Sequence, residues 1–155
     1  MLQYPIGVMS GAKVLLVNDD RRLNVINVKR EQSHKIRVMI VDDTDIVRRG
    51  LSIALETFDD MLLVGEAANG KEAVDMVSHL RPDIILMDLI MPVMDGVQAT
   101  EIIAKAHHNT KVLVLTSTTD MDMIQAAMDK GAASYLLKNL SLDELENAIH
   151  LAYAS

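Results

Sequence analysis

The chain has 155 residues, 50% of them hydrophobic, which is enough for one domain with a continuous core. Its formal charge of −7 argues against this chain alone binding nucleic acid, because an acidic surface repels a polyanion. The absence of cysteine excludes disulfides, thiolate zinc sites and cysteine nucleophiles and fits a cytoplasmic location, and no apolar run is long enough to predict membrane insertion.

Residues 1–34 form an N-terminal extension that does not follow the pattern of the remaining chain. Two strand-like runs, K-V-L-L-V at 13–17 and L-N-V-I-N-V at 23–28, flank the polar stretch N-D-D-R-R. They predict a hairpin or an extended arm. The segment K-V-L-L-V-N-D-D echoes a later R-V-M-I-V-D-D, but only the later copy precedes an amphipathic segment. We therefore interpret Asp19 and Asp20 as a solvated turn.

Residues 35–155 alternate short β-branched runs with longer amphipathic segments, a pattern typical of parallel strands joined by crossover helices. Strands this apolar are expected in a sheet that is covered on both faces. The fold class is therefore α/β, a doubly wound five-stranded parallel sheet. The predicted strands are 36–41, 61–66, 83–88, 111–116 and 134–137, and the predicted helices are 45–57, 70–79, 96–106, 120–130 and 142–152.

Polar residues stand at the carboxyl ends of four of these strands. Because those ends meet at one edge of a doubly wound sheet, we expect the residues to converge there. They are Asp42 and Asp43 after the first strand, Asp88 at the end of the third, Thr116 at the end of the fourth and Lys138 after the fifth.

The chemistry of this set favours phosphoryl transfer. Three carboxylates supply the hard oxygen ligands that Mg²⁺ prefers, and Asp88 can act as a nucleophile that forms an acyl phosphate. Asp42 and Asp43 would hold the metal, Thr116 would donate a hydrogen bond to the phosphoryl group, and Lys138 would neutralise its charge. Each residue alone also has a structural explanation, since aspartates cap helices and lysines are usually solvated, but the set at successive strand ends favours function.

Four motifs in this region resemble the receiver domains of bacterial two-component response regulators, and the resemblance runs from about residue 35 to residue 152. The motifs are V-M-I-V-D-D at 38–43, I-I-L-M-D-L-I-M-P-V-M-D-G at 84–96, V-L-V-L-T-S at 112–117 and G-A-A-S-Y-L-L-K-N at 131–139. The resemblance implies a flavodoxin-like receiver fold for residues 35–155.

The resemblance also implies roles for individual residues. Asp88 is implied as the phosphoacceptor, and Asp42 and Asp43 as acidic residues of the Mg²⁺ site. Ile90 is implied as a metal ligand through its backbone carbonyl. Thr116 and Lys138 are implied to sense the phosphoryl group, and Tyr135 matches an aromatic side chain that turns inward when the threonine moves.

The implied partners are those of a signalling switch. A sensor histidine kinase would donate the phosphoryl group, and a homodimer could form through the fourth helix, fifth strand and fifth helix. The final third is most similar to the NarL/FixJ (LuxR-type) regulators, in which a DNA-binding output domain follows the receiver. We expect DNA contact only through such a domain, which this chain lacks. A stand-alone receiver and a receiver cut from a transcription factor both fit these residues.

Two departures from the family pattern affect the phosphorylation chemistry. Asn139 follows Lys138 where many members have a proline with a cis peptide, which leaves the shape of that loop open. Ile90 is apolar two residues after Asp88, and an apolar side chain cannot orient an attacking water. We hypothesise slow spontaneous dephosphorylation.

Two other functions compete with a phosphorylation switch. The segment D-T-D-I-V at 43–47 fits the signature of haloacid-dehalogenase-like phosphatases, which also form an aspartyl phosphate. Those enzymes need a further acidic pair after their lysine, whereas here only Asp143, Glu144 and Glu146 follow Lys138, within a predicted helix. The second competitor is a pseudo-receiver that acts without phosphorylation.

Overall fold

The computed structural model describes residues 8–9, 12–19, 22–27 and 34–155. Contacts divide the chain into two units, Met1–His34 and Lys35–Ser155. No helix among the described residues has both the length and the apolar character needed to cross a membrane.

The described part of the first unit is a small antiparallel sheet in the order β1 (Val8–Met9), β2 (Ala12–Asp19) and β3 (Arg22–Asn27). Strands β2 and β3 pair antiparallel from Val14 opposite Asn27 to Asp19 opposite Arg22. The hairpin or extended arm stays a prediction, because the residues that join these two strands lie outside the described residues. Asp19 is the last residue of β2, whereas Asp20 and Val28 lie outside the described residues.

The second unit contains five strands and five helices that alternate along the chain. The sheet order is β5-β4-β6-β7-β8 and every strand pair is parallel, which confirms the predicted α/β fold. In chain order, the elements are β4 (Ile36–Val41), α1 (Asp45–Glu56), β5 (Met61–Ala67), α2 (Gly70–Leu80), β6 (Ile84–Met87), α3 (Gly96–Ala106), β7 (Lys111–Thr116), α4 (Met121–Asp129), β8 (Ser134–Leu137) and α5 (Leu142–Ala154).

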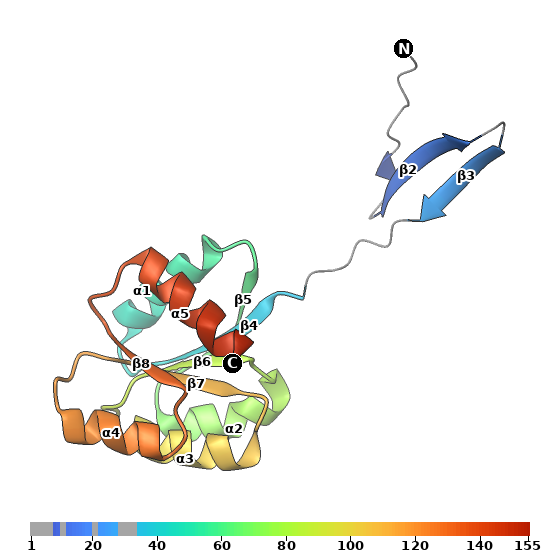
Figure 1. Cartoon of the computed structure of the whole chain (residues 1–155). Coiled ribbons are helices and arrows are strands. Elements are labelled where there is room, and N and C mark those ends of the chain that lie inside the picture. The colour runs from blue at the N-terminus through green and yellow to red at the C-terminus, as the bar shows by residue number, and fades with distance from the viewer. Residues whose placement is uncertain (1–7, 10–11, 20–21, 28–33) are drawn as a thin grey trace. The chain divides into compact units, whose positions relative to one another are not determined.

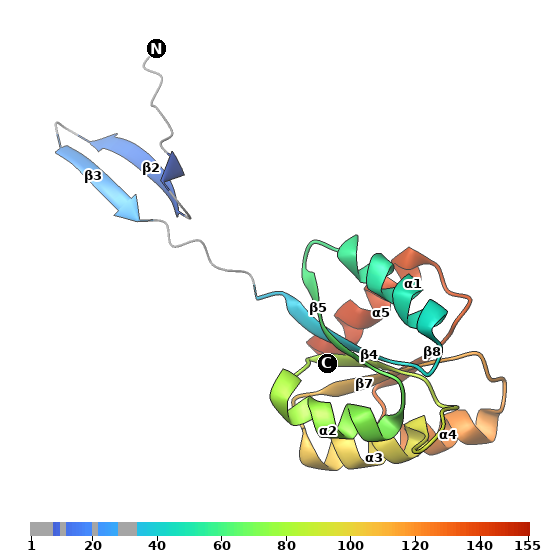
Figure 2. The same cartoon turned by 180° about the vertical axis from the view of Figure 1, so that it is seen from behind.

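Helices cover both faces of this sheet, α1 and α5 one face and α2, α3 and α4 the other (Figures 1 and 2). Successive side chains of a strand point to opposite faces, so each central strand supplies both cores. In β4, Met39 and Val41 pack in the core beneath α2, α3 and α4, while Val38 and Ile40 pack beneath α1 and α5. This double burial explains why the strands are apolar at consecutive positions.

Helix ends follow local signals in the sequence. Asn69, Asp95 and Asp120 each accept hydrogen bonds from backbone N–H groups in the first turn of the helix that follows. Ser141 and Glu144 form a reciprocal capping box at the start of α5. The observed element boundaries lie within two residues of the predicted ones.

The start of α3 passes unusually close to the end of β6. Gly96 N donates to Leu89 O at 2.9 Å, and a Cβ at position 96 would lie 2.0 Å from the backbone oxygen of Asp88. Since that neighbour is backbone, it cannot rotate away as a flexible side chain can. Glycine at position 96 therefore lets α3 begin directly against the two residues that follow the buried strand, Asp88 and Leu89.

Gly96→Ala should lower the free energy of unfolding by about 1–3 kcal/mol or more, because the methyl group must displace the Asp88–Leu89 backbone. Urea denaturation measures the change. Gly50→Ala is the matched control, since Gly50 lies inside α1 with nothing within 4 Å of its added Cβ, and it should be neutral or stabilising by up to about 1 kcal/mol. Equal effects of the two substitutions would contradict this explanation.

Candidate functional site

The candidate site lies where the strand order reverses, between the carboxyl ends of β4 and β6. From β4 the chain first moves outward to β5, and then crosses back to β6 on the other side of β4. Val41 pairs with Met87 at the ends of these strands, and Asp88 N donates to Val41 O at 2.9 Å. Asp42 and Asp88 therefore lie side by side, each directly after the end of one of two neighbouring parallel strands. This is the place where doubly wound sheets bind ligands.

Three carboxylates meet at this crevice. Asp42, Asp43 and Asp88 each offer an oxygen atom, and these atoms lie within 4.8 Å of one another. Asp42 is 2% exposed and Asp88 6% exposed, whereas Asp43 is exposed to solvent. The cluster therefore has two buried acids and an accessible third.

The Lys138 ammonium links the two buried acids. Its Nζ lies 2.7 Å from Asp42 Oδ2 and 3.3 Å from Asp88 Oδ2. The lysine is held in place through its backbone, because Lys138 N donates to Thr116 O at 2.9 Å. The residues that directly follow β4, β6 and β8 thus each contribute a charged side chain to one cluster, as the strand-end pattern predicts.

Each buried carboxylate is oriented by a backbone amide. Thr44 N donates to Asp42 Oδ1 at 2.9 Å, and Leu89 N donates to Asp88 Oδ1 at 2.9 Å. The second oxygen of each acid is the one that contacts Lys138. The carboxylates are therefore held in fixed directions before any ligand binds.

The pKa values of Asp88 and Lys138 both lie above their ordinary values. Burial raises the pKa of Asp88, the charge of Asp42 raises it further, and the attraction of Lys138 only partly offsets these effects. Burial alone would lower the pKa of Lys138, but its hydrogen bond to Asp42 and the charge of Asp88 outweigh burial and raise it. The pocket therefore favours a protonated lysine and resists ionisation of Asp88.

The donor set fits Mg²⁺. Three carboxylates and one ammonium leave two negative charges in the pocket when all four groups are ionised. All candidate ligand atoms are oxygens, which hard divalent cations prefer, and the exposed Asp43 leaves space for the waters that Mg²⁺ retains. Asp42, Asp43 and Asp88 are the side chains that would hold the ion.

Arg48, which the sequence reasoning did not identify, supports this pocket from α1. Its Nη1 donates to the backbone oxygen of Asp42 at 2.6 Å, and its Nε lies 3.6 Å from Glu66 Oε1. It also pairs with Asp45. In the sequence, Arg48 is a basic residue within the first two turns of the predicted helix that follows Asp42 and Asp43. That position is equally typical of a solvated surface residue, so it did not predict a role in the site.

The other predicted site residues, Thr116, Tyr135 and Ile90, differ in exposure and contacts. Thr116 is 1% exposed, and its Oγ1 accepts a hydrogen bond from Thr118 N at 3.2 Å; within residues 34–155 no hydrogen bond joins it to the acids. The Tyr135 side chain on the edge strand β8 is 40% exposed. Ile90 is 58% exposed in the loop after Asp88. The threonine is therefore buried, whereas the tyrosine on the neighbouring strand is partly exposed.

Comparison with known families gives a match to the response regulator receiver domain over residues 38–150. The chain belongs to this family. The match confirms the resemblance that the four sequence motifs indicated.

Individual relatives agree with this assignment. The chain is 44% identical over 118 residues to the response regulator protein VraR of Staphylococcus saprophyticus, covering 76% of this chain and 56% of that protein. It is also 44% identical over 117 residues to the transcriptional regulatory protein LiaR of Bacillus subtilis, covering 76% of this chain and 56% of that protein. The receiver thus spans about half the length of these curated relatives.

A solved structure also matches closely. The signal receiver domain of the putative response regulator NarL from Mycobacterium tuberculosis superposes with a TM-score of 0.75 at 30% identity, over 79% of this chain and 98% of that one. The relatives and this structure support the predicted similarity to NarL- and LuxR-type regulators.

The raised pKa of Asp88 in the receiver generates a pH-dependent prediction. Between the ordinary carboxyl pKa and the raised folded-state pKa, the folded protein binds more protons than the unfolded chain, so the free energy of unfolding falls as pH rises through this window. Asp88→Asn removes the charge, so in EDTA the variant should be more stable than wild type above the window. The difference should shrink as pH falls and vanish below the ordinary carboxyl pKa.

Urea denaturation across this pH range measures the effect. Asp75→Asn is the control, because Asp75 lies on the exposed side of α2 in a pair with Lys71 and should change stability by no more than about 0.5 kcal/mol. An Asp88→Asn variant less stable than wild type at every pH would contradict the electrostatic account.

Proposed function

We propose that this receiver takes a phosphoryl group from a sensor histidine kinase onto Asp88, with Mg²⁺, and so switches an output surface in transcription regulation. The observation that carries the proposal is the placement of Asp88 among two further acids and the Lys138 ammonium, which is 3.3 Å from its Oδ2. This set combines a nucleophile, a cation site and a fixed positive charge.

Each side chain of the site has a separate role in the phosphoryl transfer. A carboxylate oxygen of Asp88 forms a bond to phosphorus, while the bond from phosphorus to the donor's imidazole nitrogen breaks and its electron pair stays on that nitrogen. Lys138, already between Asp42 and Asp88, offers its charge to a phosphoryl oxygen. A bound Mg²⁺ would reduce the repulsion between the two anionic reactants. Asp42, Asp43 and Asp88 would hold that ion, together with the Ile90 carbonyl.

Thr116 and Tyr135 form the switch in this proposal. The Thr116 hydroxyl leaves Thr118 N and donates to the phosphoryl group, and Tyr135 turns into the space that the threonine vacates. Support comes from the starting positions, since Thr116 is buried and Tyr135 is half exposed on the next strand. The phosphoryl group shifts this equilibrium only by binding the switched state better than the resting state.

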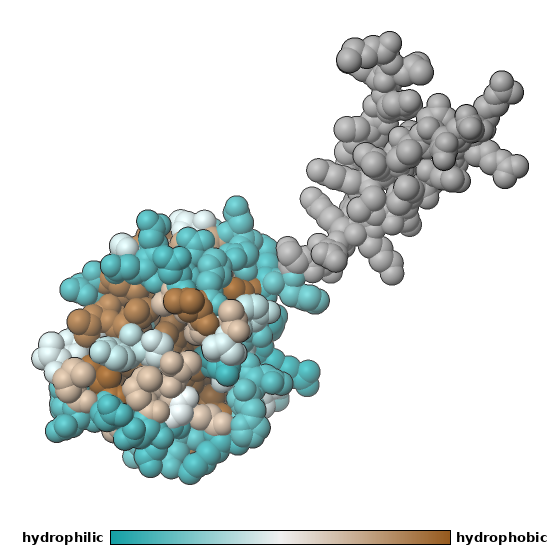
Figure 3. All heavy atoms as spheres, in the orientation of Figure 1, coloured by the Kyte–Doolittle hydropathy of each residue, from teal (hydrophilic) through white to brown (hydrophobic). Residues whose placement is uncertain are grey.

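The output surface lies over α4, β8 and α5. Figure 3 shows apolar atoms gathered across the middle of the face on which β8 and α5 lie. Among the exposed large apolar residues, Tyr135 and Leu137 lie on β8, and Leu151 and Tyr153 lie on α5. An apolar surface next to the switch is suited to a homodimer contact or to an output domain.

The role in transcription rests on the relatives. LiaR of Bacillus subtilis is described as a transcriptional regulatory protein, and the receiver corresponds to 56% of its length. We infer that DNA is contacted through an output domain outside these residues, since the acidic receiver repels a polyanion. We expect the cytoplasm as the location, where both kinase and DNA are accessible.

The phosphatase alternative is weaker. Asp45, the second acid of its signature, pairs with Arg48 and has a side chain that is 94% exposed. Of the acids after Lys138, Glu144 caps α5 and Glu146 lies near Asp60 and His150. Neither supplies the second acidic pair that such an enzyme requires.

Incubation with acetyl phosphate and Mg²⁺ tests the phosphoacceptor directly. Intact mass measurement should show the gain of one phosphoryl group in wild type, no gain in Asp88→Asn, and no gain when EDTA removes the metal. Asp75→Asn should be labelled as wild type is, because its carboxylate lies on the surface of α2. Labelling that persists in Asp88→Asn would refute the assigned nucleophile, and no labelling of wild type would favour the pseudo-receiver.

Ile90 generates a second prediction, on the lifetime of the acyl phosphate. Ile90→Asn should accelerate decay by about tenfold or more, because an amide beside Asp88 can orient the attacking water that isoleucine cannot. The exposed position makes a polar substitution tolerable for the fold. Decay is followed by the loss of phosphoryl mass with time. Ile90→Val is the control and should keep the wild-type rate; an unchanged or slower rate in Ile90→Asn would contradict the hypothesis.

A further inference from the structure

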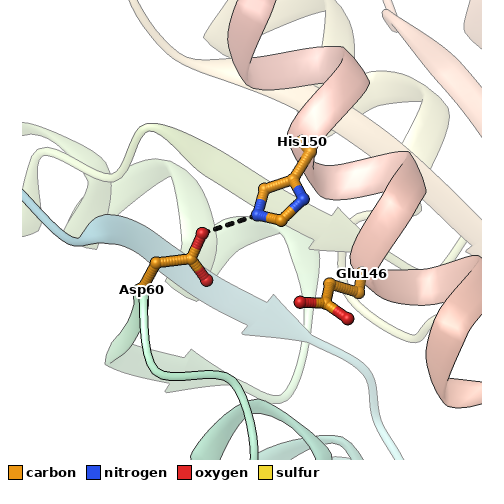
Figure 4. A group of neighbouring side chains, drawn as sticks. All are labelled: Asp60, Glu146 and His150. Carbon is orange, nitrogen blue, oxygen red and sulfur yellow. Dashed lines mark hydrogen bonds and ion pairs between the residues drawn. The ribbon is translucent and has the colours of Figure 1, made fainter.

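A second cluster of potential metal ligands lies away from the acidic pocket. Asp60, Glu146 and His150 each offer a ligand atom, and these atoms lie within 4.8 Å of one another. His150 Nε2 lies 2.6 Å from Asp60 Oδ2, at hydrogen-bond distance. Figure 4 shows Glu146 and His150 projecting from the same side of α5, with Asp60 approaching from the loop before β5. The cluster joins two elements that are far apart in the sequence.

The backbone that carries these side chains is fixed on both sides. Asp60 O accepts a hydrogen bond from Ile36 N at 2.8 Å, where β4 begins. On α5, Glu146 and His150 are four residues apart and so share one helix face. Each directly follows a buried residue, Leu145 or Ile149, that anchors the helix in the core. The three donors are therefore presented by rigid elements.

We propose that Asp60, Glu146 and His150 form a binding site for one divalent transition-metal ion of the Zn²⁺ class. Two carboxylates and one neutral imidazole form a mixed oxygen and nitrogen donor set that suits Zn²⁺ better than Mg²⁺, which prefers oxygen alone. Ligands of a tetrahedral Zn²⁺ lie about 3.3 Å apart, so the Asp60 and His150 groups need to separate by less than about 1 Å. Both side chains are partly exposed and have room to do so.

The second site is spatially independent of the phosphoacceptor pocket. Asp60 adjoins the first residue of β4, whereas Asp42 follows its last residue. Six strand residues separate the two ends, a length of about 20 Å. Solvent reaches all three ligands, which leaves the fourth coordination position for water. A bound ion would tie the middle of α5 to the loop between α1 and β5.

Isothermal titration of the full chain with ZnCl₂, in excess Mg²⁺ to compete at the all-oxygen pocket, tests this site. Wild type should bind with a single high-affinity transition. His150→Gln and Glu146→Gln should each weaken the affinity by at least about tenfold, because each removes a ligand. Both side chains are partly exposed, which favours intact folds of the variants, and circular dichroism and thermal melting verify this.

Matched variants separate this site from other histidines and acids. His108→Gln and Asp143→Asn alter exposed residues outside the cluster and should bind Zn²⁺ as wild type does. Asp88→Asn should also retain the Zn²⁺-binding transition. The test of the Zn²⁺ site is therefore independent of whether Asp88 is phosphorylated. A transition lost only in Asp88→Asn, or unchanged in both His150→Gln and Glu146→Gln, would overturn the assignment, as would the absence of Zn²⁺ binding by wild type.

Discussion

The contact of Lys138 with two buried carboxylates is the interaction on which the rest of the site depends. Asp42 and Asp88 are almost fully buried, and one ammonium at 2.7 and 3.3 Å from their oxygens is shared between them. One positive charge does not neutralise two neighbouring acids, so the pKa of Asp88 stays raised by burial and by Asp42. The site therefore carries excess negative charge when both acids are ionised, and a divalent cation can neutralise it.

The fold creates this unfavourable arrangement through backbone geometry. The register that pairs Val41 with Met87 places the next residues, Asp42 and Asp88, close together. The start of α3 at Gly96 packs directly against the Asp88 backbone, which restricts its movement away from Asp42. The two cores on either side of the sheet stabilise the strands independently of the site. A strained group of charges is tolerated at the strand ends because packing elsewhere determines where those ends lie.

Much of this arrangement could be predicted from the sequence. The apolar runs of doubly buried strands predicted the strand positions to within two residues. Because the carboxyl ends of parallel strands meet at one edge, the sequence also predicted that Asp42, Asp88 and Lys138 lie together. The contacts of Arg48 could not be predicted, because they depend on which face of α1 turns toward Asp42. The pairing of His150 with Asp60, 90 residues apart, depends on how α5 lies across the sheet, which no local pattern encodes. The direction of the Thr116 hydroxyl is likewise a tertiary property.

Helix α5 begins shortly after Lys138 and carries two of the three ligands of the proposed Zn²⁺ site. Its N-terminal cap at Ser141 follows Lys138 by three residues, so in the proposed switch a movement of the lysine toward a phosphoryl group would reach the start of the helix over a short distance. Glu146 and His150 lie further along the same helix, where a bound ion would fix it against the loop that carries Asp60. Because α5 also carries exposed apolar residues of the proposed output surface, an ion there would restrict any movement of α5 that the proposed switch requires. Occupancy of the second site would favour whichever position of α5 brings Glu146 and His150 closest to Asp60. The resting and switched states would then differ in metal affinity by the same factor with which the metal shifts their equilibrium.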